Sequence, residues 1–238
     1  EDGIRDTSVT GVQTCALPIW TDMKVAICVP CRDTVMTGFA FDLAKLCAYE
    51  GVTRCAKGGS LLIYQVPGTL IFNQRERLAD EALKDGADAI LWIDSDMRFP
   101  KDALQILLSR KLPIVGVNAT TRRFPVLPTA LDYDQETKDL VKVTSKDKTG
   151  LEEVLGLGFG MVLIRKEVFQ KVEKPWFWFE QTDKGGTIGE DIYFCVKAFD
   201  KGFKTVLDHD LSKQDRKSTR LNSSHRCISY AVFCLKKK

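Results

Sequence analysis

Short apolar runs alternate with amphipathic stretches along the middle of this chain. Continuous apolar runs such as "KVAICVP" are typical of strands that are buried on both faces of a sheet. Stretches such as "NQRERLADEALKDG" have helical periodicity and end at a glycine, a common helix stop. The pattern predicts strands at 24–30, 60–66, 87–97, 112–119 and 203–210, and helices at 39–51, 73–86, 101–110 and 190–202.

The order of these elements indicates the fold class. Strands alternate with helices over the first half of the chain, which favours a largely parallel sheet covered by helices on both faces. Residues 120–150 are more polar and hairpin-like, with short candidate strands in "TALDYD" and "LVKVT". Residues 154–172 are expected to form a glycine-rich segment, a strand and a helix. We therefore expect a single α/β domain with a mostly parallel, mixed sheet.

The two ends of the chain are related to each other at the level of DNA. Residues 9–19, "VTGVQTCALPI", can be written in codons whose reverse complement encodes "DRKSTRLNSSH", residues 215–225. The same relation joins residues 1–8 to residues 226–233. The encoding DNA resembles a sequencing-library adapter that was read at both ends of a short insert. We therefore predict that 1–19 and 215–238 are adapter-derived and non-native, and that 20–214 is a native domain cut at DNA fragment ends.

This interpretation changes the charge balance. The whole chain has a net charge of +3, whereas residues 20–214 contain 27 Lys and Arg against 28 Asp and Glu, a formal charge of −1. No electrostatic argument for nucleic-acid binding remains. No apolar run approaches the roughly 18 residues of a membrane span. The five cysteines of this region form an odd number, which favours a reduced, cytoplasmic setting.

The sequence Cys28-Val29-Pro30-Cys31 has the spacing of a redox or zinc half-site. No second cysteine pair with metal spacing exists in the chain, and Cys28 falls within a predicted strand. We therefore interpret both cysteines as structural.

Asp94-Ser95-Asp96 follows the apolar run "AILWI". In open α/β sheets, ligands bind beyond the carboxyl ends of the strands. Two carboxylates at positions i and i+2 can point the same way and share a hard cation such as Mg²⁺ or Mn²⁺. The alternative is a turn and helix cap without a ligand, for which Asp-Ser-Asp is also suitable.

Gly189-Glu190-Asp191 opens the predicted helix at 190–202. A carboxylate at a helix start is stabilised in its ionised form by backbone N–H groups, and it can serve as a general base. Helix capping alone is the alternative. The preceding aromatic residues, Trp176 to Phe179, could stack on a sugar ring or belong to the core.

These motifs together resemble a GT-A glycosyltransferase of the family-2-like type found in phage and bacterial genomes. The resemblance is carried by "GADAILWIDSDMRFPKDALQILL", by "GLGFGMVLIRKEVF" and by the downstream Gly-Glu-Asp, and it extends from "VAICVP" to "VLDHD". It implies a metal-dependent enzyme that moves a sugar from a nucleotide-sugar donor to an acceptor hydroxyl, with Mn²⁺ or Mg²⁺ as cofactor. The acceptor, whether glycan, lipid or protein, is not specified.

The resemblance also implies roles for individual residues. Asp96 would ligate the metal directly, Asp94 would face the ribose or a metal-bound water, and Asp191, or second Glu190, would be the base. His209 would complete the metal site, unless a further histidine belongs in the region beyond Gln214. Residues implied to bind the nucleotide-sugar are Pro30, Arg75 (in preference to Arg77), Asp94, Ser95, Gly158 and Gly160.

Two other functions remain open at this point. A GT-A-like nucleotidyltransferase would have the same architecture, but it would need a glycine-rich phosphate loop and a lysine near the first strand, and "VPCRD" supplies neither. A non-catalytic sugar- or metal-binding module would use the acidic residues as a Ca²⁺ loop, although few oxygen ligands cluster within one short segment.

Overall fold

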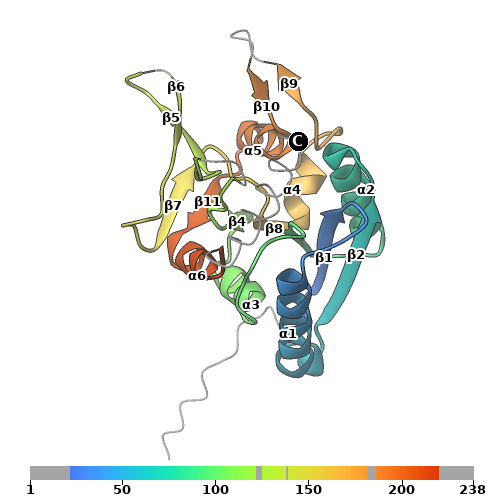
Figure 1. Ribbon diagram of the computed structural model, residues 1–238. Coiled ribbons are helices and arrows are strands. Elements are labelled where there is room, and N and C mark those ends of the chain that lie inside the picture. The colour runs from blue at the N-terminus through green and yellow to red at the C-terminus, as the bar shows by residue number, and fades with distance from the viewer. Residues whose placement is uncertain (1–21, 122–124, 138, 182–185, 220–238) are drawn as a thin grey trace, which may run out of the picture.

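A computed structural model describes residues 22–121, 125–137, 139–181 and 186–219 (Figure 1). The predicted adapter-derived segment 1–19 and residues 220–238 of the predicted segment 215–238 lie outside the described residues, and helix α6 extends past Gln214 to Thr219. The strands are β1 Lys24–Cys31, β2 Ser60–Pro67, β3 Ala89–Ile93, β4 Ile114–Gly116, β5 Leu131–Asp134, β6 Asp139–Lys142, β7 Leu151–Val154, β8 Met161–Arg165, β9 Glu180–Gln181, β10 Thr187–Ile188 and β11 Thr205–Asp208. The helices are α1 Thr37–Thr53, the 3₁₀ turn η1 Cys55–Lys57, α2 Ile71–Lys84, α3 Ala103–Ser109, α4 Lys166–Lys171, α5 Glu190–Asp200 and α6 His209–Thr219.

A seven-stranded mixed sheet forms the centre of a single α/β domain, in the order β2-β1-β3-β8-β4-β11-β7. Strands β2, β1 and β3 are parallel to one another, as are β4 and β11. Strand β8 lies between β3 and β4 and is antiparallel to both. This mostly parallel arrangement confirms the predicted fold class and is consistent with a Rossmann-like GT-A fold.

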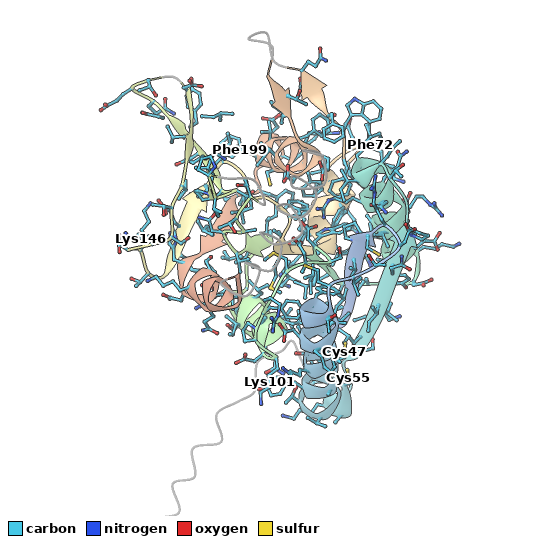
Figure 2. All side chains as sticks on the ribbon, viewed as in Figure 1. Cys47, Cys55, Phe72, Lys101, Lys146 and Phe199 are labelled. Atoms are coloured by element: carbon cyan, nitrogen blue, oxygen red, sulfur yellow. The ribbon has the colours of Figure 1, made fainter. Side chains whose placement is uncertain are left out.

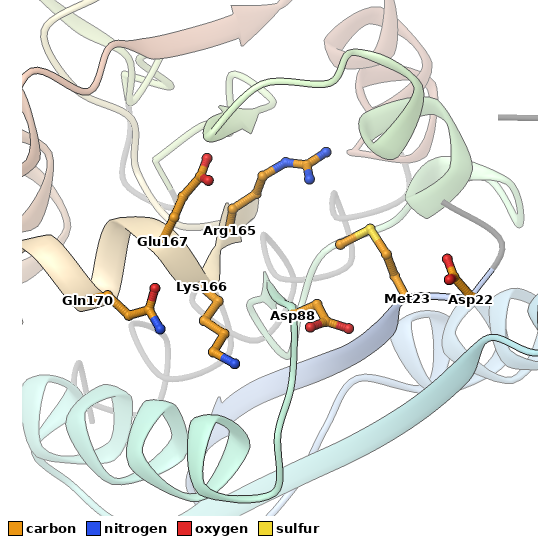
Figure 3. Close-up of a pocket in the computed structure, with 7 residues that line it drawn as sticks. All are labelled: Asp22, Met23, Asp88, Arg165, Lys166, Glu167 and Gln170. Carbon is orange, nitrogen blue, oxygen red and sulfur yellow. The ribbon is translucent and has the colours of Figure 1, made fainter. Parts of the chain in front are cut away.

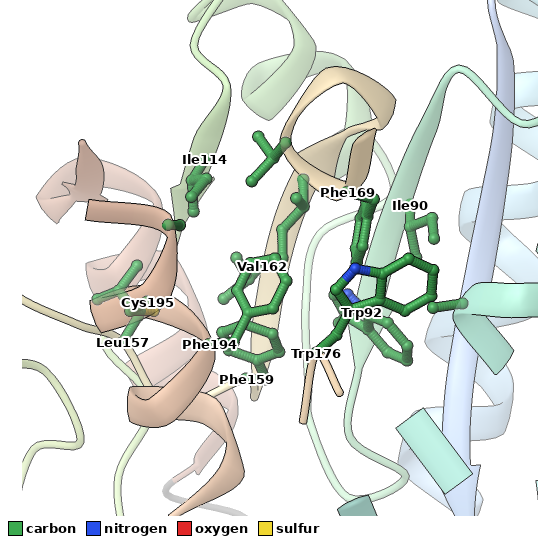
Figure 4. Packing of buried hydrophobic residues seen from close by; sticks show 14 of the residues in the cluster. Ile90, Trp92, Ile114, Leu157, Phe159, Val162, Phe169, Trp176, Phe194 and Cys195 are labelled. Atoms are coloured by element: carbon green, nitrogen blue, oxygen red, sulfur yellow. The ribbon is translucent and has the colours of Figure 1, made fainter. Parts of the chain in front are cut away.

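Each face of the sheet has its own apolar core, because successive side chains of a strand point to opposite faces. All five residues of β3, "AILWI", are buried. On one face, Trp92 packs with Phe159, Phe169 and Phe194 beneath α2, α4 and α5 (Figure 4). On the other face, Leu91 and its neighbours pack beneath α1, α3 and α6. A strand buried on both faces has no polar alternation, which explains the continuous apolar run.

The helices and the main strands confirm the predicted elements, with end shifts of a few residues. The final strand ends at Asp208 rather than at residue 210, and His209 begins helix α6. Strand β7 and the small β9–β10 hairpin were not predicted from the sequence. Both the β5–β6 and the β9–β10 hairpins project toward the top of Figure 1. The second of these hairpins leads directly into the Gly-Glu-Asp motif.

Candidate functional site

The Asp94-Ser95-Asp96 turn is held in place by backbone hydrogen bonds on three sides. The Asp94 N–H donates to the carbonyl of Gly160, just before β8, at 2.9 Å. The Met97 N–H closes the turn on the Asp94 carbonyl at 3.1 Å, and the Met36 N–H donates to the Ser95 carbonyl at 3.1 Å. The acidic turn therefore has a fixed place at the carboxyl end of β3, as the sequence predicted. The Asp94 side chain is 34% exposed, so one side of it faces the solvent.

Arg75 is buried beside this turn. Its Nη2 lies 3.0 Å from Asp94 Oδ1, and its Nε lies 3.2 Å from Glu190 Oε1. Its guanidinium carbon lies 5.4 Å from the centre of the Trp92 ring and 5.2 Å from that of Phe159. One arginine of α2 thus joins a carboxylate that follows β3 to a carboxylate that begins α5. Its guanidinium also contacts two aromatic rings through cation–π interactions.

The position of Arg75 follows from its place in α2. The neighbouring Gln74 donates from Nε2 to the carbonyls of Cys31 and Val66, at 2.5 and 2.9 Å, and so ties the start of α2 to the ends of β1 and β2. Arg77 lies on the solvent face of the same helix. The structure therefore brings Arg75, rather than Arg77, to the acidic turn.

Asp191 is the second residue of α5, in the first turn of the helix, and the extended Gly189 is the N-cap residue. The Ile192 N–H donates to Asp191 Oδ1 at 2.8 Å. Burial, reinforced by the neighbouring Glu190 carboxylate and opposed by Arg75, raises the pKa of Asp191 to about 6. A carboxyl group with this pKa is mostly ionised at pH 7 but accepts a proton more readily than an ordinary aspartate.

The site carries an excess of negative charge. Asp94, Glu190 and Asp191 surround the single guanidinium of Arg75, which leaves a formal charge of −2 before Asp96 is counted. This charge suits a divalent cation. The described residues contain no group of three or more His, Cys, Asp and Glu side chains arranged for metal binding. The residues would fit a hard cation held by Asp94 and Asp96 together with water and substrate phosphates, as Mg²⁺ commonly binds, rather than a closed protein cage.

The structure does not bring His209 together with Asp96. His209 is buried between Ser145 Oγ, 2.8 Å from Nδ1, and Glu152 Oε2, 2.7 Å from Nε2. Strands β8 and β4 separate β11 from β3, which at about 4.8 Å for each strand spacing places the two strand ends on the order of 14 Å apart. Both ring nitrogens have partners among the described residues, so in this structure His209 contacts Ser145 and Glu152 rather than the acidic turn.

Gly158 and Gly160 allow close packing within the protein. A Cβ at Gly158 would lie 2.6 Å from Thr129 Cβ, and one at Gly160 would lie 2.5 Å from Ala119 Cβ. Pro30 is buried near the end of β1, and continuing the β1–β3 register by two residues from Cys28 and Trp92 places it beside Asp94. Pro30 and Gly160 therefore lie close to the acidic turn, whereas Gly158 packs against the side chain of Thr129.

Cys28 and Cys31 are buried and free. Burial raises the pKa of the Cys28 thiol far above its ordinary value, which makes its thiolate unfavourable. Cys31 Sγ lies 3.1 Å from Gln65 Nε2. These surroundings agree with the structural interpretation of the Cys-x-x-Cys sequence.

The four aromatic residues before β9 divide into two pairs. Trp176 and Phe177 are buried in the core, whereas Trp178 and Phe179 are 50% and 40% exposed. The exposed pair packs edge-to-face on Phe72, with ring centres 4.9 and 5.4 Å apart, at the upper end of α2 in Figure 2. The chain then passes through β9, whose partner β10 precedes Glu190. The exposed pair is thereby placed near the start of α5.

Several neighbours of the acidic turn were missed by the sequence analysis. Trp92 and Phe159 hold Arg75, and their only sequence signal was an aromatic residue within an otherwise aliphatic or glycine-rich segment. Arg98 binds the buried Asp42 carboxylate, with Nε 2.5 Å from Oδ2, and so ties the segment after the acidic turn to α1. Nothing in the local sequence around Asp42 predicted this ion pair.

A cleft of about 530 Å³ lies elsewhere in the molecule (Figure 3). It is located where β1 and β3 begin, at the edge of the sheet opposite to the acidic turn. Its lining residues are Asp22, Met23, Asp88, Arg165, Lys166, Glu167 and Gln170. This cleft is therefore separate from the candidate site.

No helix among the described residues combines the length and the apolar character needed to cross a membrane.

Comparison with known proteins yields similarity at the level of the fold. No protein-family model matches the chain, and no curated protein sequence matches it. Among solved structures, A197 from STIV aligns with a TM-score of 0.53 and 17% identity, over 78% of this chain and 81% of that one. S. aureus TarS 1-349 aligns with a TM-score of 0.43 and 14% identity, over 78% of this chain and 57% of that one. At such identities the likeness to A197 concerns the fold alone.

Proposed function

We propose that this protein is a metal-dependent glycosyltransferase, which transfers a sugar from a nucleotide-sugar donor to an acceptor hydroxyl. One observation carries the proposal. Arg75 joins the carboxylate of Asp94, beyond β3, to that of Glu190, at the start of α5, and this brings the acidic turn close to Asp191. A hard-cation site and a carboxyl group with a raised pKa are the two groups that such a transfer needs.

Mn²⁺ or Mg²⁺, held by Asp96 and Asp94, would neutralise the charge on the nucleoside-diphosphate leaving group. Asp191 accepts the proton of the acceptor hydroxyl as the acceptor oxygen forms its bond to the anomeric carbon. The bond from this carbon to the diphosphate oxygen breaks with its electron pair. Glu190 is the second candidate for the base, but its carboxylate is ion-paired with Arg75. Asp191 is therefore the stronger candidate.

The remaining parts of the proposed site bind the two substrates. Ser95 lies in the acidic turn and is partly exposed, Pro30 and Gly160 lie beside the turn, and Gly158 lies two residues before Gly160. The exposed rings of Trp178 and Phe179 are suited to stack on the apolar face of an acceptor sugar.

A donor screen tests this proposal. Thermal unfolding of the chain is measured with Mn²⁺ and UDP-, GDP- or TDP-sugars, and sugar transfer or donor hydrolysis is measured with any donor that stabilises it. Stabilisation by a nucleotide-sugar together with Mn²⁺ is expected. Stabilisation by nucleoside triphosphates alone would instead favour the nucleotidyltransferase, and metal binding without any turnover would favour the non-catalytic module.

Asp96→Ala tests the metal dependence directly. We expect this variant to lose turnover and the response to Mn²⁺, because one of two carboxylate ligands is removed. Asp102→Ala is the matched control, since Asp102 lies six residues further along and makes no side-chain cap with α3. Equal turnover in the Asp96 variant and the control would sink the metal-dependent mechanism.

A further inference from the structure

We propose that Arg75 is a positioning residue that holds the metal-facing carboxylate of Asp94 and the base-bearing start of α5 at a fixed separation. This inference rests on the proposed function for its catalytic meaning. It differs from the role that the family resemblance implies, in which an arginine at this place contacts the nucleotide.

The contacts of Arg75 are directed to the protein. Two of its three guanidinium nitrogens bind carboxylates, Nη2 that of Asp94 and Nε that of Glu190. Its side chain is only 3% exposed. A donor molecule that arrived from the solvent would first meet Asp94, which is about a third exposed. Arg75 therefore lies behind the acidic turn, and nucleotide contact would need its displacement from both carboxylates.

The surroundings make the two ion pairs depend on each other. The guanidinium lies over the rings of Trp92 and Phe159 and is almost fully buried, so water has little access to it. In such a place, the loss of one member of an ion pair leaves the other charge without compensation. The planar guanidinium also fixes the directions of its N–H groups, which a lysine would not do. The distance between the two carboxylates therefore depends on the shape of the guanidinium as well as on its charge.

The two carboxylates belong to elements that are far apart in the sequence. Asp94 follows β3, whereas Glu190 begins α5, and the described structure joins their side chains through Arg75. Asp191 is the next residue along α5, so a shift of Glu190 carries Asp191 with it. In enzymes, displacement of a reacting group by about 1 Å can cost on the order of 100-fold in rate.

The third guanidinium nitrogen of Arg75 does not face the solvent. Arg75 Nη1 is buried and no described residue accepts a hydrogen bond from it. A small buried acceptor such as a water molecule would satisfy this N–H group. The contacts of Nη2 with Asp94 and of Nε with Glu190 do not depend on this acceptor.

The experiment compares Arg75→Met, Arg75→Lys and the control Arg77→Met, an exposed arginine on the same helix. Donor turnover and the binding of UDP without metal are measured for the full chain. We expect Arg75→Met to lower kcat about 100-fold while the donor KM and the UDP dissociation constant change less than about threefold, below the tenfold that 1.4 kcal/mol of lost binding would give. Arg75→Lys should restore only part of kcat. Arg77→Met should resemble the wild type.

A second measurement does not depend on activity. Urea unfolding midpoints are compared for Arg75→Met, Glu190→Gln and the double variant. We expect the double variant to be more stable than the sum of the two single losses predicts, because neutralising Glu190 removes the uncompensated charge. If Arg75→Met weakened UDP binding tenfold and left kcat unchanged, or if the stability losses of the two single variants were additive, the positioning role of Arg75 would be refuted. If the wild type turns over no donor, the proposed function fails. The urea unfolding of the single and double variants then still decides whether Arg75 couples to Glu190.

Discussion

Asp191→Asn tests the central feature of the candidate site by its effect on stability. Burial next to Glu190 raises the pKa of Asp191 from 3.8 to about 6 in the folded protein. The ionised carboxylate is therefore less favourable in the folded than in the unfolded chain. The contribution of Asp191 to stability is complete below about pH 4 and is lost as the pH rises through about 6.

The magnitude follows from the pKa difference. At about 1.36 kcal/mol for each pH unit, a pKa raised from 3.8 to about 6 corresponds to at most about 3 kcal/mol. Asp191 is partly exposed, so solvent screening lowers this figure, and we expect about 1–3 kcal/mol. An asparagine carries no charge and avoids this cost. Relative to the wild type, Asp191→Asn should therefore gain about 1–3 kcal/mol between pH 4 and pH 7 while it loses transfer activity about 100-fold or more.

The assay is urea unfolding followed by tryptophan fluorescence between pH 4 and pH 8 for both proteins. The difference between variant and wild type isolates Asp191 from the other titrating groups. Asp200→Asn, at the exposed end of the same helix, is the matched control, because it neutralises a carboxylate of α5 away from the candidate site. A stability difference that does not change with pH, or one that turns against the variant at higher pH, would refute the reasoning.

Three further predictions concern other parts of the molecule. Trp178→Ala should raise the acceptor KM several-fold and leave the donor KM unchanged, because its half-exposed ring precedes β9, whose partner β10 leads into α5; equal changes in both KM values would argue against an acceptor contact. His209→Gln should cost about 1–3 kcal/mol in urea unfolding through its lost contacts with Ser145 and Glu152, while the Mn²⁺ concentration for half-maximal turnover stays unchanged; a tenfold increase in this concentration would restore the histidine to the metal site. Phe194→Ala should cost about 3–5 kcal/mol, measured by the same unfolding, because Phe194 packs on Phe159, Phe169 and Phe177, and a loss below about 1 kcal/mol would contradict the described core.

The relation between stability and activity at Asp191 has a general physical origin. A base with a raised pKa needs burial and like-charged neighbours, and both cost free energy in the folded state. Arg75 offsets part of this cost because its positive charge lowers the pKa of Asp191. The candidate site is thus held together by the same arginine that limits its excess of negative charge.

The sequence alone determined the class of the fold and the elements that carry the acidic motifs. Apolar runs without polar alternation identified β1 and β3, because a strand covered on both faces must be apolar throughout. Local helix signals placed α2 and α5. The acidic turn was predicted at the end of β3 for the same reason, since the apolar run stops where the strand leaves the core.

Tertiary structure alone decided which of these groups meet. Arg75 is separated from Glu190 by 115 residues, and no local pattern records that their side chains are in contact. The resemblance to a family suggested a metal ligand at His209, but the strand order places β8 and β4 between β11 and β3 and leaves His209 with Ser145 and Glu152. Patterns along a chain report burial and local conformation, whereas pairing between distant side chains depends on strand order and on the packing of helices against the sheet.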